Sequence, residues 1–383
     1  MNAFKQRHQT VCARFCLHAL RGCAAAVLWM VHSWVMAQSV VFINPGKTDE
    51  AYWVAAAQSM QQAARSLGMQ LQVIYTERDR LRPIAVARLI AQRPKAERPD
   101  YVIFSNEYSV APSILRELDG SGIKVFMAFS GIQDDLRDQV GVPRERFPFW
   151  LGSLGSNAED AGYLTARALI QAAAKKPQWR DANGKWQMLA IAGDRSTPSS
   201  IARNRGMRKA VLEATGQVEL MQEVYGEWRQ DKAQEQAHVL FKRYPQARLV
   251  WAGTDLMAFG AMEAWAQQGG RPGKDALFSG INTSRAAFEK LRSGELTALA
   301  GGHFLVGAWA MVMLFDYHHG VDFASEGLES EVSTFKLFDK SSSRQFEKRF
   351  GSQNTAALSF KSFSKRLNPK LRSYDFDIDK LLR

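Results

Sequence analysis

The stretch SVVFINPGKTDEAYWVAAAQSMQQAARSLGMQLQVIYTE, residues 39–77, decides the fold class. It opens with an apolar run that Pro45 and Gly46 end, which is typical of a buried strand. A helix is expected next, ending at Gly68, because one face carries apolar residues at alternating spacings of four and three: Trp53, Ala57, Met60, Ala64 and Leu67. A second apolar run, residues 71–77, indicates another strand. Strand, helix and strand in this order favour a parallel pair.

The same alternation of strand and helix continues along the chain. Further strands are expected at 100–107, 124–131, 186–193, 217–226, 247–253 and 276–282. Further helices are expected at 84–92, 111–122, 158–174, 202–213, 231–244 and 256–268. This order predicts parallel sheets covered by helices on both faces.

One segment interrupts the alternation. GVPRERFPFWLGSLGSN, residues 141–157, is rich in proline and aromatic residues, and we interpret it as the passage from a first lobe to a second. The fold class that follows is α/β, with two doubly wound parallel-sheet lobes of similar architecture. The two lobes share no close sequence repeat.

The first 37 residues have the three parts of a secretory signal. A basic region without acidic residues is followed by an apolar run from Cys23 to Met36, and Val35-Met36-Ala37 is the pattern that signal peptidase cuts. We therefore expect export of the protein and a mature chain from Gln38. An uncleaved membrane anchor is the alternative, although the apolar run is shorter than the ~20 residues of a spanning helix.

Removing this segment also changes the composition. All three cysteines lie in it, so the mature chain can form neither a disulfide nor a thiolate metal site. Removal of its four basic residues lowers the net charge from +12 to +8. The remaining basic residues are scattered, which argues against nucleic acid as a partner.

The motifs of common enzymes are missing. Gly46-Lys47-Thr48 resembles the end of a phosphate-binding loop, but Val41 stands where the first glycine belongs. No G-x-G-x-x-G follows the first strand, and no serine lies in G-x-S-x-G. The adjacent His318 and His319 are expected to cap a helix end rather than to bind a metal. We expect no catalysis, no cofactor and no metal, with an exported enzyme as the alternative.

Two segments near the C-terminus differ from the rest. Residues 304–315 are strongly apolar but too short to cross a bilayer, so we expect a helix buried between or against the lobes. Residues 355–383 carry a basic cluster and aromatic residues without long periodicity, and we expect a tail fixed onto the body of the protein.

The stretch TPSSIARNRGMRKAV, residues 197–211, has the pattern of a helix start with Ser199 or Ser200 as N-cap. This interpretation places Arg203 and Arg205 in the first turn, where the helix dipole disfavours cations. We therefore expect the arginines to serve something other than helix stability.

Four motifs between about Val40 and Glu331 resemble the periplasmic solute-binding proteins of the ribose-binding type. In order, they are VFINPGKTDEAYW, with adjacent aromatics opening a helix; SIARNRGMRKAV; VWAGTDLMAFGA; and FSGINTS. The resemblance, which extends to the autoinducer-2 receptor, implies two lobes joined by a three-strand hinge. The implied lobes are residues 38–149 with about 303–328, and residues 150–302 with about 329–350, followed by an extension, 351–383.

The resemblance also implies a ligand cleft between the lobes. Arg203 would donate forked hydrogen bonds to ligand oxygens, and Arg205 would support its neighbours, with a solvated arginine as the alternative for each. Tyr52 and Trp53 would stack on a sugar ring, although core packing competes for Trp53. The other implied contacts are Asn106 at the end of a strand, Trp228 (alternatively only packing), Thr254, Asp255, Asn282 and His303.

This chain departs from the family pattern at three places. Extra residues from Lys47 to Glu50 lengthen the first loop, so that Asp49 or Glu50 could contact ligand. Phe129-Ser130 replaces an Asp-Arg pair that binds hydroxyl groups in the family. The C-terminal extension is the third. These departures leave the identity of the ligand open.

The function that the resemblance implies is capture of a small polar ligand, a sugar or sugar-like molecule, and its presentation to the membrane permease of an ABC importer. The alternative is a periplasmic sensor that feeds a membrane histidine kinase or a cyclic-nucleotide signalling enzyme. A cytoplasmic regulator of the same fold would need a DNA-binding helix-turn-helix where this chain has its signal sequence.

Overall fold

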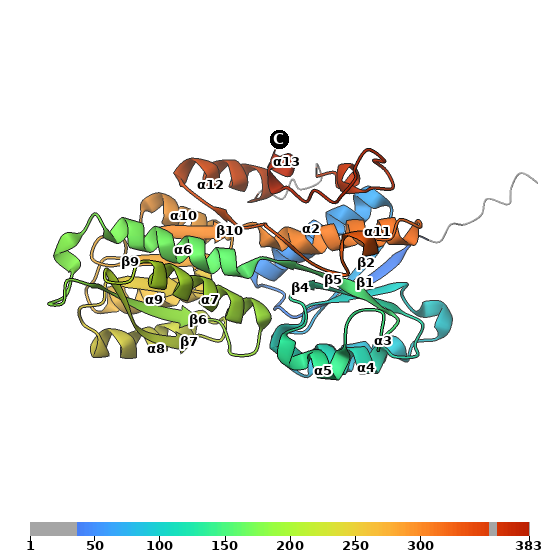
Figure 1. Ribbon diagram of the computed structural model, residues 1–383, viewed down its shortest axis with the longest axis horizontal. Coiled ribbons are helices and arrows are strands. Elements are labelled where there is room, and N and C mark those ends of the chain that lie inside the picture. Colours follow the sequence, from blue (N-terminus) through green and yellow to red (C-terminus); the bar gives the residue numbers. More distant parts are fainter. Residues whose placement is uncertain (1–36, 352–357, 383) are drawn as a thin grey trace, which may run out of the picture. The chain divides into compact units, whose positions relative to one another are not determined.

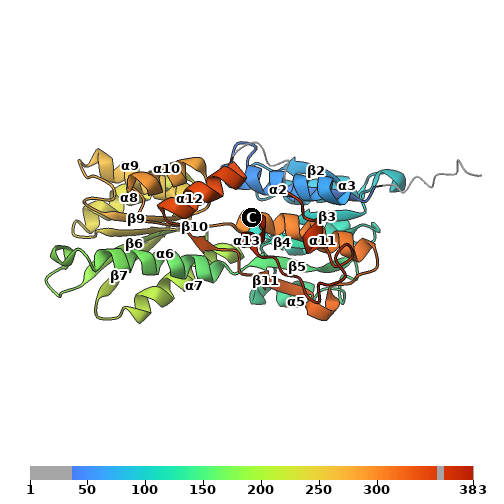
Figure 2. The ribbon, with the colours of Figure 1, turned by 90° about the horizontal axis from the view of Figure 1, so that it is seen from above.

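The computed structural model describes residues 37–351 and 358–382. The signal peptide expected for residues 1–37 lies outside these residues, apart from Ala37. Two parallel sheets form the body of the protein, each with a set of helices around it (Figures 1 and 2). The expectation of two doubly wound α/β lobes is confirmed.

Each sheet has six strands within the described residues. The first sheet has the order β11-β5-β4-β3-β1-β2, and all its strands are parallel. The second has the order β12-β10-β9-β8-β6-β7, parallel except for β12, which runs antiparallel to β10. In both sheets the order reverses beside the first strand of the lobe, and this is where open α/β sheets place ligands.

The strands of the first sheet are β1 (Ser39–Asn44), β2 (Gln70–Tyr75), β3 (Tyr101–Phe104), β4 (Lys124–Phe129), β5 (Trp150–Ser156) and β11 (Glu329–Val332). Those of the second are β6 (Trp186–Ala192), β7 (Val218–Tyr225), β8 (Leu249–Ala252), β9 (Leu277–Ile281), β10 (Ala298–Gly301) and β12 (Lys336–Leu337).

The helices of the first half are α2 (Ala51–Leu67), α3 (Arg82–Ala91), α4 (Ala111–Leu118) and α5 (Arg137–Val140). The second half contains α6 (Ala158–Ala173), α7 (Pro198–Glu213), α8 (Gln230–Arg243), α9 (Asp255–Gln267) and α10 (Arg285–Ser293). After it come α11 (Val306–His318), α12 (Lys340–Phe346) and α13 (Ile378–Leu382).

The strand pairing corrects our interpretation of residues 141–157. Residues 150–156 form β5, which pairs with β4 and β11 in the first sheet, so this part of the segment is a sheet strand and not a passage between lobes. The chain first crosses to the second sheet after Ser156, beyond the expected boundary at residue 149. Two glycines and two serines in WLGSLGS weaken the strand signal, although the whole strand is buried.

Two further crossings follow, one after β10 and one after β11. The boundary expected near residue 328 therefore lies after Val332, because β11 belongs to the first sheet. Three backbone passages thus join the lobes, and a ligand between the lobes would lie close to the axis about which they can rotate.

Packing on the two faces of the first sheet explains why its strands are apolar throughout. Val41 and Ile43 of β1 belong to one hydrophobic cluster, with residues of α3 and α4, whereas Phe42 belongs to another, with residues of α2 and α11. Successive side chains of a strand point to opposite faces, so a sheet covered on both sides needs a continuous apolar run.

The strongly apolar segment at 304–315 is buried, as expected. It forms most of α11, whose residues from Val306 to Asp316 are buried, and it packs along α2. None of the helices in the described part of the chain combines the length and the apolar character needed to cross a membrane.

The C-terminal segment lies across both lobes (dark red in Figures 1 and 2). Phe346 of α12 packs against Phe288 of α10 in the second lobe. Farther on, Phe376 stacks on Trp309 of α11 in the first, with ring centroids 5.4 Å apart. This agrees with the expectation of a tail fixed onto the body of the protein.

Asp316, at the end of α11, holds the tail in place. The side chain is fully buried and accepts hydrogen bonds from the backbone of Lys365 (2.7 Å) and Arg366 (3.2 Å). It also accepts from the hydroxyls of Ser364 and Tyr374. One carboxylate thus satisfies four donors of the tail.

We expect Asp316→Ala to lower the free energy of unfolding by roughly 3 kcal/mol, because it leaves several buried donors without an acceptor. Chemical denaturation measures the loss. The control is Asp375→Ala, in the same tail, which removes only an exposed ion pair with Lys380 and should change stability by less than about 0.5 kcal/mol. Equal effects of the two substitutions would show that Asp316 does not hold the tail.

Candidate functional site

A cavity lies between the two lobes, at the carboxyl ends of the strands of both sheets. Fourteen residues line it: Glu50, Tyr52, Trp53, Arg78, Glu107, Phe129, Ser130, Ser156, Ser199, Arg203, Trp228, Thr254, Asn282 and His303. Seven of the nine residues expected to contact ligand are among them: Tyr52, Trp53, Arg203, Trp228, Thr254, Asn282 and His303. That each of them binds a ligand stays a prediction.

Asn106 does not line the cavity. Its side chain is fully buried, donates to the carbonyl of Gly131 (2.8 Å) and accepts from the backbone N–H of Ala111 (2.9 Å). Its amide therefore joins the loops after β3 and β4 and satisfies a free N–H at the start of α4. The strand β3 ends at Phe104, two residues before Asn106, and the neighbouring Glu107 lines the cavity in place of Asn106.

Asp255 lies behind the cavity rather than on its wall. It accepts a hydrogen bond of 2.8 Å from the side-chain amide of Asn282, which does line the cavity. Burial raises the pKa of Asp255, and hydrogen bonds from Ser284 and Asn282 oppose that rise. Asp255 therefore orients Asn282, whose backbone has the unusual φ of 123°.

The helix that carries Arg203 begins earlier than expected. Its N-cap is Thr197 and its first residue is Pro198, so Arg203 and Arg205 lie in the second turn and the interpretation of Ser199 or Ser200 as N-cap is wrong. Proline is common at the first position of a helix because its missing N–H costs nothing there. The helix dipole therefore gives no reason to single out these arginines.

The two arginines have different surroundings. Arg205 is exposed and forms an ion pair with Glu159 on the surface. Arg203 is 5% exposed and lines the cavity. The solvated alternative therefore describes Arg205 and not Arg203.

Two glycines bring the backbone of Arg203 to its place. A Cβ atom on Gly162 of α6 would lie 1.9 Å from the carbonyl oxygen of Arg203, and one on Gly206 of α7 would lie 1.9 Å from that of Glu159. The backbones of α6 and α7 are thus in direct contact at this crossing, and only glycine leaves room for it.

The guanidinium of Arg203 is held by two neighbours. It donates to the carbonyl of Gly253 (2.7 Å) and bonds Nε2 of His303 (2.9 Å). The ring centroids of Trp228 and Phe335 lie 5.6 and 5.9 Å from its central carbon. Burial lowers the pKa of Arg203 to about 10, so it stays a cation at neutral pH.

Aromatic side chains form much of the wall. Tyr52 stacks on His303, with ring centroids 4.5 Å apart, and Trp53 packs edge-on against Phe129 at 5.2 Å. Trp53 is 2% exposed, so it serves the core and the cavity wall at the same time. Core packing is therefore confirmed for Trp53, and its stacking on a ligand stays a prediction.

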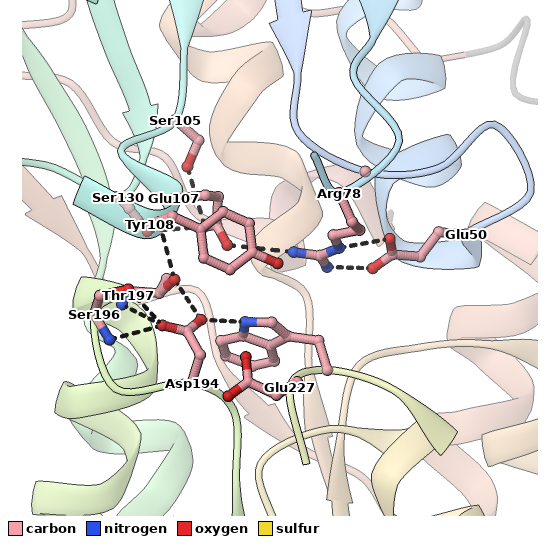
Figure 3. Close-up of polar contacts among 12 residues, drawn as sticks. Glu50, Arg78, Ser105, Glu107, Tyr108, Ser130, Asp194, Ser196, Thr197 and Glu227 are labelled. Carbon is pink, nitrogen blue, oxygen red and sulfur yellow. Dashed lines mark hydrogen bonds and ion pairs between the residues drawn. The ribbon is translucent and has the colours of Figure 1, made fainter. Parts of the chain in front are cut away.

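Arg78 and two carboxylates form a cluster on the first lobe that sequence reasoning missed in large part (Figure 3). Arg78 binds Glu50 through two nitrogens and reaches Glu107 at 3.4 Å. Glu107 also accepts hydrogen bonds from the hydroxyls of Ser105 and Ser130. Arg78 and Glu107 each come three residues after the end of a parallel strand, and this position is the feature of the sequence that could have identified them as cavity residues.

The second lobe presents a cluster around Asp194 opposite the first (Figure 3). Asp194 accepts from the backbone N–H groups of Ser196 and Thr197, from the Thr197 hydroxyl and from the indole of Trp228. Burial alone would raise the pKa of Asp194, but these hydrogen bonds lower it below its usual value. The indole of Trp228 is thereby fixed on the cavity wall.

Direct hydrogen bonds join the two lobes at the edge of the cavity. The backbone N–H of Tyr108 donates to the hydroxyl of Thr197 (3.3 Å). The Ser109 hydroxyl and the Gln133 amide both donate to the carbonyl of Ser196, at 3.2 and 3.0 Å. The structure therefore has the lobes in contact with each other over the cavity.

The environment of Glu107 predicts a pH dependence of stability. Burial raises its pKa from 4.5 to about 7, and the nearby Arg78 offsets only part of that rise. Between these values the folded protein binds a proton that the unfolded chain releases, so stability falls as pH rises through 7. The contribution amounts to roughly 3 kcal/mol at most.

We expect Glu107→Gln to remove this contribution. Chemical denaturation at pH 5 and pH 8 should show wild type losing stability relative to the variant at the higher pH. A stability difference that is the same at both pH values would contradict the assignment, because it would mean that Glu107 is ionised throughout.

The residues described by the structure contain no group of three or more histidine, cysteine, aspartate or glutamate side chains that could hold a metal ion. What the cavity offers is a set of hydrogen-bonding groups and aromatic faces. Such a set suits recognition of a polar molecule with apolar ring faces.

Comparisons with known proteins agree with this architecture. The family model described as "Periplasmic binding protein domain" matches residues 40–320. A periplasmic sugar-binding protein from Pseudomonas fluorescens is 38% identical, with a TM-score of 0.80, over 90% of this chain and 100% of its own. No curated protein sequence gives a match.

Two more distant structures share the fold. An ABC transporter periplasmic solute-binding protein from Actinobacillus succinogenes, with bound D-allose, is 17% identical over 80% of this chain and 99% of its own, with a TM-score of 0.67. The binding protein of the arabinose ABC transporter from Shewanella sp. ANA-3 is 20% identical over 84% and 98%, with a TM-score of 0.62. The chain belongs to the type I periplasmic binding proteins, a family of binding proteins rather than of enzymes.

Proposed function

We propose that this protein binds one sugar or sugar-like molecule between its two lobes in the periplasm and presents it to the membrane permease of an ABC importer. The observation that supports the proposal most strongly is the cavity wall itself. It combines the rings of Tyr52, Trp53 and Trp228 with the polar groups of Arg203 and Asn282.

This combination suits a sugar for two reasons. The C–H faces of a pyranose or furanose ring pack on aromatic rings, while the hydroxyl groups at its edge need donors and acceptors in fixed positions. Arg203 and Asn282 are fixed by Gly253 and Asp255 behind them, so they can bond a ligand without first losing much rotational freedom.

The mechanism is closure of the lobes over the ligand. Three backbone passages act as the hinge, and a ligand that contacts both lobes favours the closed state by its extra contacts there. The permease would then recognise the closed form. We choose import over sensing because two solved structures of the same fold are described as parts of ABC transporters.

Thermal unfolding with a panel of aldoses, furanoses and polyols tests the proposal. A ligand that binds only the folded protein stabilises it by about 2.7 kcal/mol at a hundredfold excess over Kd, which is easily detected as a rise in Tm. We expect one sugar, or one group of related sugars, to give this rise. No rise with any carbohydrate, neutral or acidic, would contradict the proposal.

A further inference from the structure

Three buried N–H groups of residues that line the cavity have no hydrogen-bond acceptor within the described residues. They are Nε of Arg203, Nδ1 of His303 and Nε1 of Trp53. All three side chains are at least nine-tenths buried, with exposed fractions of 5%, 4% and 2%. Buried polar groups are almost always paired. Other buried groups of the described chain also lack a partner, among them the indoles of Trp265 and Trp309, but these three belong to residues of one cavity wall, where a ligand can supply the missing acceptors.

The contact between Arg203 and His303 determines which group of the imidazole faces a ligand. A guanidinium can only donate, so Nε2 of His303 must accept the 2.9 Å hydrogen bond from Arg203. The proton of the neutral ring then lies on Nδ1, the atom without a partner. Burial and the neighbouring cation keep the pKa of His303 well below its usual value, in agreement with a neutral ring.

The charge of Arg203 is also unbalanced. Arg78, on the opposite lobe, has carboxylates of Glu50 and Glu107 within ion-pair distance. Arg203 has none among the described residues, and its two partners are a carbonyl oxygen and a neutral ring. A buried cation with no anion in direct contact is costly, and an anionic ligand group would offset that cost.

We propose that the ligand is a sugar acid, whose carboxylate binds at Arg203 and His303. The two oxygens of a carboxylate can only accept hydrogen bonds, and the three free N–H groups can only donate them. The hydroxyl groups of the same ligand would face the carboxylate of Glu107 and the hydroxyl of Ser130 across the cavity. This inference rests on the proposed function and narrows its ligand class.

A neutral sugar would satisfy the same region less well. A ring oxygen or hydroxyl can accept one of the free N–H groups, but it leaves the guanidinium without a counter-charge. The carboxylates of Glu107 and Asp255 attract Arg203 only from beyond ion-pair distance, and Glu107 already contacts Arg78.

Isothermal titration tests the inference with the full chain expressed and purified from the periplasm. The probes are matched pairs: each aldose of a panel of common hexoses and pentoses, together with its aldonate and, for the hexoses, its uronate. We expect at least one acid to bind at least tenfold more tightly than its neutral parent. The methyl ester of that acid keeps every hydroxyl group but loses the charge, and it should bind at least tenfold more weakly.

Substitutions test where the carboxylate binds. Arg203→Gln should remove the preference for the acid over its ester, whereas Arg205→Gln, the same change two residues along the helix, should keep it. The ester comparison uses unaltered protein, so the inference stays testable if Arg203→Gln fails to fold.

Three results are decisive. Tighter binding of an acid supports the inference. A neutral sugar that binds as tightly as its acids overturns the inference and leaves the proposed function standing. Binding of neither class overturns both.

Discussion

Replacing Arg203 by alanine is expected to weaken ligand binding at least about 100-fold while leaving the protein folded. A guanidinium makes charge-assisted hydrogen bonds, each contributing roughly 1.5–3 kcal/mol, and a hundredfold loss corresponds to about 2.7 kcal/mol. Arg203→Ala leaves the carbonyl of Gly253 and Nε2 of His303 without a donor, which costs roughly 1–3 kcal/mol of stability. The fold should tolerate this loss because no carboxylate within the described residues loses an ion-pair partner. Isothermal titration with the ligand found in the panel measures the loss.

Arg205→Ala is the matched control. It makes the same change on the same helix, but Arg205 is exposed and bonds Glu159 outside the cavity. We expect binding within about twofold of wild type, since surface ion pairs contribute little. Equal losses in the two variants would show that α7 matters as a whole and that Arg203 has no particular role.

Replacing Gly162 by alanine is expected to lower the free energy of unfolding by roughly 2–4 kcal/mol and to weaken ligand binding as well. The added Cβ would lie 1.9 Å from the carbonyl oxygen of Arg203, so α6 and α7 must separate. Overpacking against backbone is costly because no side-chain rotation relieves it. Moving α7 also moves Arg203 away from Gly253 and His303.

Denaturation and titration of the same variant measure the two effects together. The control is Gly155→Ala in β5, where the nearest atoms to an added Cβ lie 3.6 Å and farther away, an ordinary contact distance. Its stability should change much less. If Gly162→Ala were as stable as Gly155→Ala, the direct contact between α6 and α7 would not be what positions Arg203.

Much of the architecture could be predicted because strand and helix alternate regularly in the sequence. The helix after β1 was expected to end at Gly68, and Gly68 caps it in a left-handed conformation. Apolar strands covered on both faces have a distinct pattern, and α11 could be identified as a buried helix from its length and composition. Local signals of this kind need no knowledge of distant parts of the chain.

The missed features depend on contacts that are distant in sequence or on weak local patterns. β5 contains glycine and serine at four of seven positions, and only its burial between β4 and β11 makes it a strand. Arg78 and Glu107 come from separate loops, and neither loop alone shows that they form one cluster with Glu50.

The direction of a side chain was equally hard to predict at the strand ends. Asn106 and Glu107 are neighbours after β3, yet one supports the loop and the other lines the cavity. Which of two adjacent side chains faces the cavity depends on the backbone conformation of that loop, and Tyr108 and Ser109 there have positive φ angles of 55° and 59°.

Native mass spectrometry of the protein purified from the periplasm, before and after addition of the sugar and sugar-acid panel, tests whether the cavity beside Arg203 binds a carbohydrate. We expect one ligand per chain, with the mass of a carbohydrate, in wild type and in Arg205→Ala, and its loss in Arg203→Ala. A carbohydrate that stays bound to Arg203→Ala as firmly as to wild type would contradict this expectation, because the ligand would then lie outside the cavity that Arg203 lines.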